Sequence, residues 1–194
     1  SLTGTGSLAG LDSNLTFSGG LQVNEVGLPP LYIGPAEVDL VVDDVLGVPR
    51  VRLTARGDDI RTGTVPLGSF QLSGGATAGA ARVNDFRSER GDTVVTLSGR
   101  ADFSDTSVVI IVGSLGIDVE QNQWRMTERT DVRVDPTGIR LARVQLSSEF
   151  GNMTVRDLDT SSDSYSGSLQ LSRFDLGLLN PFLPDSVALA GQAT

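Results

Sequence analysis

The chain has 194 residues, of which 5% are aromatic, and it contains no cysteine and no histidine. The absence of both residue types excludes disulfides, thiol nucleophiles, imidazole bases and the usual zinc, haem and iron–sulfur ligand sets. The net charge of −9, with the fifteen basic residues scattered singly, leaves no footprint for nucleic acid and would repel anionic lipid head groups.

A five-residue pattern, Leu-x-Gly-x-Ala/Gly, occurs four times in the chain. Because side chains alternate across a strand, the leucine, glycine and alanine of each copy should share one face. A glycine that recurs inside strands predicts a bend, a bulge or a close approach to the backbone, and we expect room on the inner face. The copies begin at Leu2, Leu72, Leu97 and Leu189. Because the last copy begins just before the chain ends at Thr194, we expect the chain to be a fragment of a longer protein.

Apolar and polar residues alternate with a period of two along most of the chain, which predicts half-buried antiparallel strands. Residues 108–112 are apolar on both parities, which is consistent with a strand covered on both faces. The prolines at 29 and 30 indicate an edge or a loop. Turns are predicted at residues 57–59, 90–92 and 150–152, and the clearest hairpin is predicted at Asp135-Pro136-Thr137-Gly138.

One segment near the end of the chain departs from the strand pattern. Asp175 is a suitable helix N-cap, and Pro181 would stop the helix after about a turn and a half. We therefore predict an all-β fold with at most one or two short helices, in which residues 1–194 form a single continuous segment.

No residue of the sequence has the pattern of a catalytic group, and we expect neither an enzyme nor a bound cofactor or metal. The carboxylate pairs Asp43-Asp44 and Asp58-Asp59 are interpreted as solvated turn charges, because adjacent strand residues point to opposite faces. Trp124 together with Met126 could line an aromatic binding cleft, but a lone tryptophan on an apolar strand face is more often a packing residue.

The second half of the chain resembles the TamB/AsmA-like proteins of the diderm bacterial envelope, in the region ahead of their C-terminal end. The resemblance is strongest over residues 90–194, where the motifs occur in the same order. Residues 1–89 resemble the family only in their general pattern. The motifs that carry it lie at residues 90–103, 124–126, 135–141, 169–184 and 189–191.

The resemblance implies a long, mostly antiparallel repetitive sheet curled into an open U-shaped groove with an apolar interior. It implies a non-catalytic segment of a periplasm-spanning protein that is anchored in the inner membrane by parts outside this chain. The groove would carry phospholipid acyl chains towards the outer membrane, with an outer-membrane barrel protein of the TamA/BamA type as partner. The groove lining maps onto Leu97, Gly99, Ala101, Phe103, Trp124, Met126, Val132, Val134, Ile139, Leu141, Val144, Leu146, Leu169 and Leu171.

A structural or adhesive β-repeat protein is the alternative, because iteration of strands alone would satisfy it. Its core should pack dry and full, whereas the lining of a lipid groove should be accessible.

Overall fold

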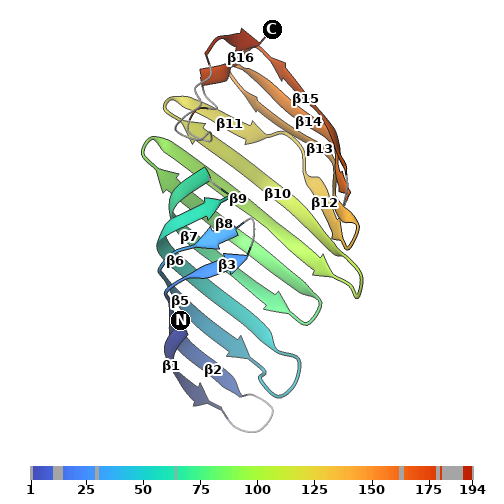
Figure 1. Cartoon of the computed structure of the whole chain (residues 1–194). Helices are drawn as coiled ribbons and strands as arrows, with labels where there is room; N and C mark the ends of the chain where they lie inside the picture. Colours follow the sequence, from blue (N-terminus) through green and yellow to red (C-terminus); the bar gives the residue numbers. More distant parts are fainter. Residues whose placement is uncertain are drawn as a thin grey trace. The chain divides into compact units, whose positions relative to one another are not determined.

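The protein is all-β, as the alternating sequence predicts (Figure 1). The computed structural model describes residues 2–10, 15–28, 31–63, 65–161, 164–177, 180 and 190–193. Strands make up well over half of these residues, and every strand pair among them is antiparallel. The internal contacts divide the chain into two compact units, Ser1–Arg90 and Gly91–Thr194.

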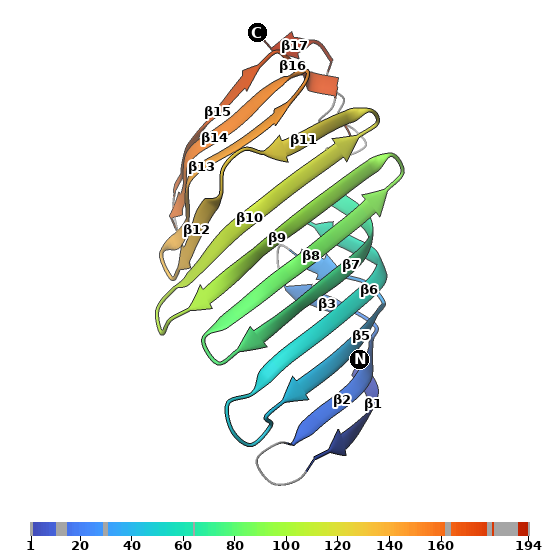
Figure 2. The ribbon, with the colours of Figure 1, turned by 180° about the vertical axis from the view of Figure 1, so that it is seen from behind.

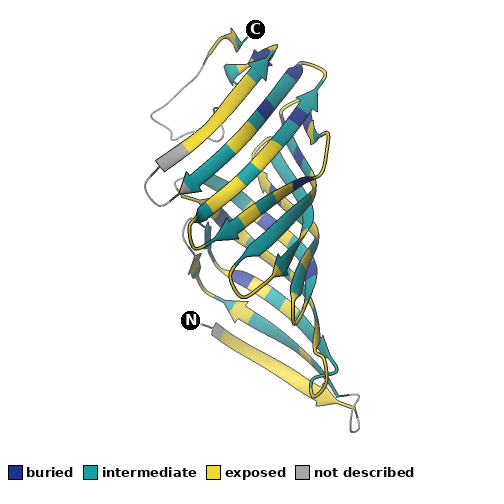
Figure 3. Cartoon of the chain, turned by 90° about the vertical axis from the view of Figure 1, so that its right-hand side faces the viewer, coloured by how far each residue is buried: buried dark blue, intermediate teal, exposed yellow. Residues whose placement is uncertain are grey.

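The strands of the first unit are β1 (Leu2–Ala9), β2 (Thr16–Val23), β3 (Val26–Leu28), β4 (Leu31–Ile33), β5 (Ala36–Asp43), β6 (Arg50–Thr62), β7 (Val65–Thr77) and β8 (Ala80–Arg90). Across the sheet they follow the order β1-β2-β5-β6-β7-β8. The hairpin of β3 and β4 leaves this order, and β4 pairs with the last residues of β6. Residues 3–9 of β1 are exposed, as the strand beside the N-terminus in Figure 3 shows.

The strands of the second unit are β9 (Thr93–Phe103), β10 (Val108–Val119), β11 (Asn122–Met126), β12 (Thr130–Asp135), β13 (Gly138–Ser148), β14 (Gly151–Ser161), β15 (Ser164–Ser172), β16 (Phe174–Asp175) and β17 (Gln192–Ala193). The strands β11 and β12 both lie between β10 and β13, so together they fill one row of the sheet. The short strands β16 and β17 pair only with each other among the described residues (Figure 2).

The strand register gives each unit one apolar and one polar face. In the first unit, Leu53 lies opposite Leu40 on one side and Gly74 on the other, and all three share a face. The neighbouring row on the other face is charged, where Arg56 pairs with Glu37. The alternation in the sequence therefore translates directly into two chemically different faces.

A β-bulge in β10 follows the run that is apolar on both parities. The register shifts between Val112 and Ser114, so Val112 and Leu115 share a face in spite of their odd spacing. Val109 and Ile111 turn to the polar face, where their partners are charged, and both are half-buried. The run is thus a strand with one polar side rather than one fully buried on both sides.

Each unit has a small hydrophobic core at one end of its apolar face. In the first unit, the core is Ala36, Ile60 and Phe70, and residues of the β3–β4 hairpin pack against it. In the second unit, the core is Val119, Trp124, Leu146 and Phe174. Both cores therefore form where a pair of short strands, β3–β4 or β16–β17, contributes apolar side chains to the face of the sheet.

Most predicted turns are present, and one is wrong. Residues 91–92 and 136–137 are turns, and Glu149–Phe150 precede the glycine that starts β14. Residues 57–59, predicted as a turn, lie inside β6, because a register shift between Gly57 and Ile60 accommodates them without ending the strand. The prolines at 29 and 30 lie outside the described residues.

The predicted helix at residues 175–181 is a short 3₁₀ segment where the structure describes it. Leu176, Gly177 and Asn180 have 3₁₀ geometry, and the described residues contain no α-helix. The carboxylate of Asp175 accepts a hydrogen bond from the Gly177 amide at 2.8 Å, which is the capping role expected of it. Residues 178–179 and 181 lie outside the described part of the chain.

Candidate functional site: the apolar face of the second unit

The register places all fourteen predicted lining residues on one face of the second unit. Through directly opposed pairs, the face continues from Leu97 to Leu115 on β10, and from Ile117 to Trp124 on β11. It continues from Met126 to Leu146 on β13, and through β14 to the last strands. We call this surface the apolar face. It comprises Leu97, Gly99, Ala101, Phe103, Trp124, Met126, Val132, Val134, Ile139, Leu141, Val144, Leu146, Leu169 and Leu171, with further residues on β10 and β14.

The further residues were missed because their signal was ambiguous. Val108, Ile110 and Val112 lie on the apolar face, opposite residues of β9 and β12. Their run is apolar on both parities, so the sequence does not distinguish them from Val109 and Ile111. On β14, Met153, Val155 and Leu158 complete the face, as their partners on β13 show.

The apolar face is covered at one end and uncovered at the other. Trp124 and Leu146 are only 3% and 2% exposed, and Phe174 of β16 packs against them. At the other positions the side chains are half-buried or exposed, and Phe103, Ile139 and Leu169 reach 50%, 42% and 58% exposure. The predicted lining is therefore part packed core and part accessible apolar surface.

The covered end is an aromatic contact. The rings of Trp124 and Phe174 lie with their centroids 4.8 Å apart and their planes tilted by 44°. This separation is within the favourable range for aromatic pairs. In this structure Trp124 is therefore a buried packing residue and does not line an open cleft.

The centre of the uncovered end is a strip of six hydrocarbon side chains, and Thr160, whose hydroxyl accepts a hydrogen bond from the Ile139 amide, lies beside it. Val132 lies between Ile110 and Leu141, and Val134 lies between Val108 and Ile139. All five of the residues other than Ile139 are half-buried. This strip offers dispersion contacts and no hydrogen bonds from side chains, so it suits a ligand without polar groups.

The glycines in the first three copies of the repeat allow close packing and do not leave open space. A β carbon on Gly99 would lie 2.5 Å from the carbonyl oxygen of Ile111, and one on Gly74 would collide with the carbonyl oxygen of Arg82. In β1, the space beside Gly4 and Gly6 is filled by side chains of β2. The close backbone approach is confirmed at Gly74 and Gly99, and the expected room is absent beside Gly4, Gly74 and Gly99 but present beside Gly191, which has no neighbour within 4 Å.

The opposite face of the second unit carries compensating charges. Asp135 lies 3.3 Å from Arg140 and 3.9 Å from Arg133, and Arg140 lies 3.5 Å from Asp159. The Thr137 hydroxyl and amide donate hydrogen bonds to Asp135, and together with the two arginines they hold the pKa of Asp135 below its ordinary value. The predicted hairpin at residues 135–138 is thus fixed by its first side chain.

The candidate carboxylate pairs do not converge. Asp43 bonds Arg52 at 2.9 Å, whereas Asp44 accepts a hydrogen bond from the Val48 amide at 3.0 Å in the following turn. Asp58 and Asp59 are neighbours within β6. The described residues hold no cluster of three or more side chains suited to a metal ion.

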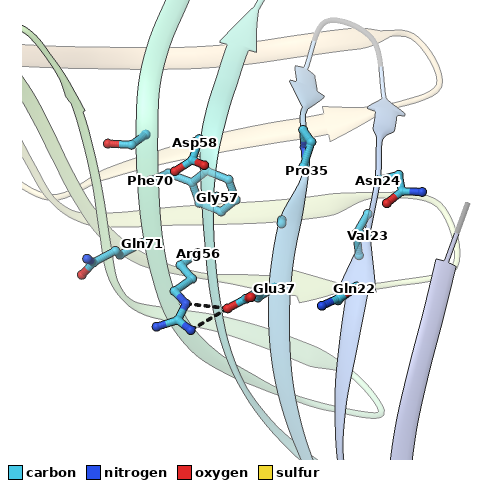
Figure 4. A pocket seen from close by; sticks show the side chains of 12 residues that line it. Gln22, Val23, Asn24, Pro35, Glu37, Arg56, Gly57, Asp58, Phe70 and Gln71 are labelled. Atoms are coloured by element: carbon cyan, nitrogen blue, oxygen red, sulfur yellow. Dashed lines mark hydrogen bonds and ion pairs between the residues drawn. The ribbon is translucent and has the colours of Figure 1, made fainter.

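A hollow of about 580 Å³ lies in the first unit, on two adjacent rows across β2, β5, β6 and β7. In Figure 4, the Arg56 guanidinium points at the Glu37 carboxylate, and Phe70 lies above them, beside Asp58 and Gly57. The Nε of Arg56 donates to Glu37 at 2.8 Å, and this bond raises the pKa of Arg56. The charges of Arg56 and Glu37 neutralise each other, and Asp58 is the third charged residue that lines the hollow.

Comparison with protein-family models, curated proteins and solved structures finds no match for this chain. Among the described residues, there is no helix that is long and apolar enough to cross a membrane.

Proposed function

We propose that the apolar face of the second unit binds phospholipid acyl chains, as the lining of an open U-shaped groove with an apolar interior. The observation that carries this proposal is the uncovered strip around Val132, Val134, Ile139 and Leu141, which lies on the same face as a well-packed core. Soluble proteins rarely leave a contiguous apolar surface without a partner for it. An acyl chain is such a partner, since it has no polar group that the strip would need to satisfy.

The energetics suit passage of a lipid better than tight capture. Exposing an acyl chain to water costs about 0.8 kcal/mol per methylene, and a continuous apolar strip removes much of that cost. Neighbouring positions on the strip are valine, isoleucine and leucine, so a chain is bound about equally well at each of them. Such a surface lets a lipid move along it, and the direction of movement has to come from elsewhere.

From the resemblance to the TamB/AsmA-like proteins, we also propose where the protein acts and with which partners. In this proposal, the chain is a non-catalytic segment of a periplasmic protein that is anchored in the inner membrane through parts outside these residues. It would carry phospholipid between the inner and outer membranes and support outer-membrane protein assembly with a barrel protein of the TamA/BamA type. No cofactor and no nucleic acid takes part.

A structural or adhesive β-repeat protein is the second candidate, and the two buried cores favour it. Around Trp124 and around Phe70 the apolar face is packed by the chain itself, as a dry core would be. The two candidates differ in what happens at the uncovered strip, because only the lipid-binding protein needs it accessible.

Site-specific photo-crosslinking in cells separates the two candidates. We expect a crosslinker at Val134 or Leu141 to capture phospholipid, because these residues lie on the apolar face. The matched controls are Arg133 and Arg140, the adjacent residues on the opposite face of the same two strands. Equal capture at all four positions would contradict the assigned face, and capture at none of them would favour the structural protein.

A further inference from the structure

We propose that Phe174 is a stopper that ends the lipid-binding strip of the second unit, confining apolar ligand to the end around Val134 and Ile139. This inference rests on the proposed function and adds a boundary to it. Without the stopper, the accessible apolar face would extend further along β10, β11 and β13. Phe174 therefore determines how much of the face a ligand can use.

The position of Phe174 fits this role. The residue is 3% exposed, and its ring lies against Trp124 in the core that includes Val119 and Leu146. Leu176, which follows β16, and Ala193 of β17 pack around this core. These side chains occupy the surface that Trp124, Met126 and Val144 would otherwise offer to a ligand.

The stopper is held by its own hydrogen bonds. Phe174 lies opposite Ala193 in the β16–β17 pair, and the Leu176 amide donates to the Gly191 carbonyl at 2.9 Å. The Asp175 carboxylate, which accepts from Gly177, fixes the following turn. The position of Phe174 is therefore set by the backbone on both sides and not by its ring contact alone.

At the other end of the face, no described residue plays the corresponding role. Ile139 is 42% exposed, and its directly opposed neighbours, Val134 and Thr160, belong to the sheet itself. The face is thus closed at the Trp124 end and open at the Ile139 end. A ligand that lies on this face meets a wall of aromatic side chains in one direction only.

The first unit repeats this arrangement with different residues. Its core of Ala36, Ile60 and Phe70 is packed by Leu31 and Ile33 of the β3–β4 hairpin, at one end of the face. Strands further along the same face carry Val42, Val51 and Ala76, which are half-buried. A pair of short strands that covers one end of an apolar face is therefore a shared feature of both units.

The single tryptophan of the chain gives a direct test, because Trp124 lies beneath the stopper. The probe is a phospholipid with brominated acyl chains, which quenches tryptophan fluorescence only on contact. The full chain is incubated with this lipid as wild type, as Phe174→Ala, and as a reporter with Trp124→Phe and Ile139→Trp. We expect weak quenching in the wild type, and quenching several times stronger in Phe174→Ala and in the reporter.

The outcomes separate the stopper from the lipid-binding function. Quenching of Trp124 in the wild type as strong as that of the reporter would overturn the stopper and leave lipid binding intact. Unchanged Trp124 quenching in folded Phe174→Ala, beside a quenched reporter, would also overturn it. An unquenched reporter in a protein with a wild-type circular dichroism spectrum would overturn the lipid-binding function itself.

A second variant covers the case in which Phe174→Ala does not fold. Phe174→Leu keeps an apolar side chain in the core but leaves part of the Trp124 ring uncovered. We expect its quenching to lie between that of the wild type and that of the reporter. Quenching equal to the wild type would then overturn the stopper.

Discussion

Gly99 and Ile111 lie on neighbouring strands with their backbones so close that a β carbon on Gly99 would come within 2.5 Å of the Ile111 carbonyl oxygen. Gly74 has the same relationship to the carbonyl oxygen of Arg82, one copy of the repeat earlier. In both places the strand register shifts nearby, between Ser73 and Gly74 and between Val112 and Ser114. In these two copies, the glycine therefore marks a position at which the sheet tightens near a bulge.

Substitution of Gly99 by alanine should destabilise the protein. A backbone carbonyl cannot move away as a flexible side chain can, so the strand pair must separate locally to admit the methyl group. Overpacking of this kind costs about 1–3 kcal/mol. Chemical denaturation of Gly99→Ala measures the loss in the free energy of unfolding.

Gly113→Ala is the matched control, because Gly113 belongs to the same strand pair. Its nearest neighbour would be the Ser98 hydroxyl at 3.5 Å, which is an ordinary contact distance. We expect its effect to be much smaller than that of Gly99→Ala. Equal losses for the two variants would show that the close approach at Gly99 is not what restricts that position.

Truncation of two leucines on the apolar face should distinguish its packed core from its edge strand β15. Leu146 is 2% exposed in the core beneath Phe174, so Leu146→Ala should cost about 2–5 kcal/mol. Leu169 is 58% exposed on β15, so Leu169→Ala should change stability by about 0.5 kcal/mol or less. Thermal unfolding of both variants checks the difference, and a large loss for Leu169→Ala would mean that this edge position is in fact packed.

The two faces of the sheet could be predicted because the side-chain period of a strand is two. Alternation around the hairpin at residues 135–138 correctly places Val132, Val134, Ile139 and Leu141 on one face. The odd spacing between Leu141 and Val144 does not break the face, because the extra residue is absorbed on the polar side. Local alternation of this kind is enough to predict the strands and the face on which each side chain lies.

The covering of Trp124 could not be predicted in the same way. Phe174 lies fifty residues further along the chain, and no periodicity relates the two residues. The register shift at residues 57–60 was also missed, since Gly-Asp-Asp has the composition of a turn and only the pairing with β7 shows that the strand continues. Contacts between distant segments, and the choice between a bulge and a turn, depend on pairing that the sequence does not display.

The stability of the hairpin at residues 135–138 should depend on pH through Asp135. Hydrogen bonds from Thr137, together with Arg140 and Arg133, lower the pKa of this carboxyl in the folded state. A lowered pKa contributes stability that is present above the unfolded value of about 4 and is lost as the pH falls through the folded value. We expect Thr137→Val to raise the pKa of Asp135, as carboxyl carbon shifts in an NMR titration would report. No change in that pKa would mean that the Thr137 hydroxyl is not its main determinant.

Two arginine pairs on the polar face should respond in opposite ways to the same substitution. Arg143 lies directly opposite Arg156, and within the described chain no ion pair joins either of them to a carboxylate. Like charges in this position are destabilising, so Arg156→Glu should stabilise the protein by about 0.2–1 kcal/mol.

Arg140→Glu provides the contrast, because Arg140 lies opposite Arg133 but between Asp135 and Asp159. The substitution would remove the ion pairs of Arg140 with Asp135 and Asp159 and place a third carboxylate beside these two. We therefore expect Arg140→Glu to destabilise the protein. Both effects should shrink as salt is added, because the groups are exposed. Thermal unfolding at low and high ionic strength measures them, and a loss of stability in Arg156→Glu would show that the opposed arginines do not repel.

A buried carboxylate should distinguish the two ends of the apolar face most sharply, and it also tests the proposed function. Leu146→Asp places a charge in a core that is closed to water and has no partner for it, so we expect a cost of several kcal/mol and an unfolded protein. Leu141→Asp places the same group on the uncovered strip, where it keeps much of its hydration, so we expect the protein to stay folded. Circular dichroism checks both expectations. In the folded Leu141→Asp protein, a crosslinker at Val134 should lose most of its phospholipid, because a charge beside the strip opposes an acyl chain. Undiminished capture there would contradict the proposed binding surface, and unfolding of Leu141→Asp without any captured lipid in the parent protein would support the structural β-repeat instead.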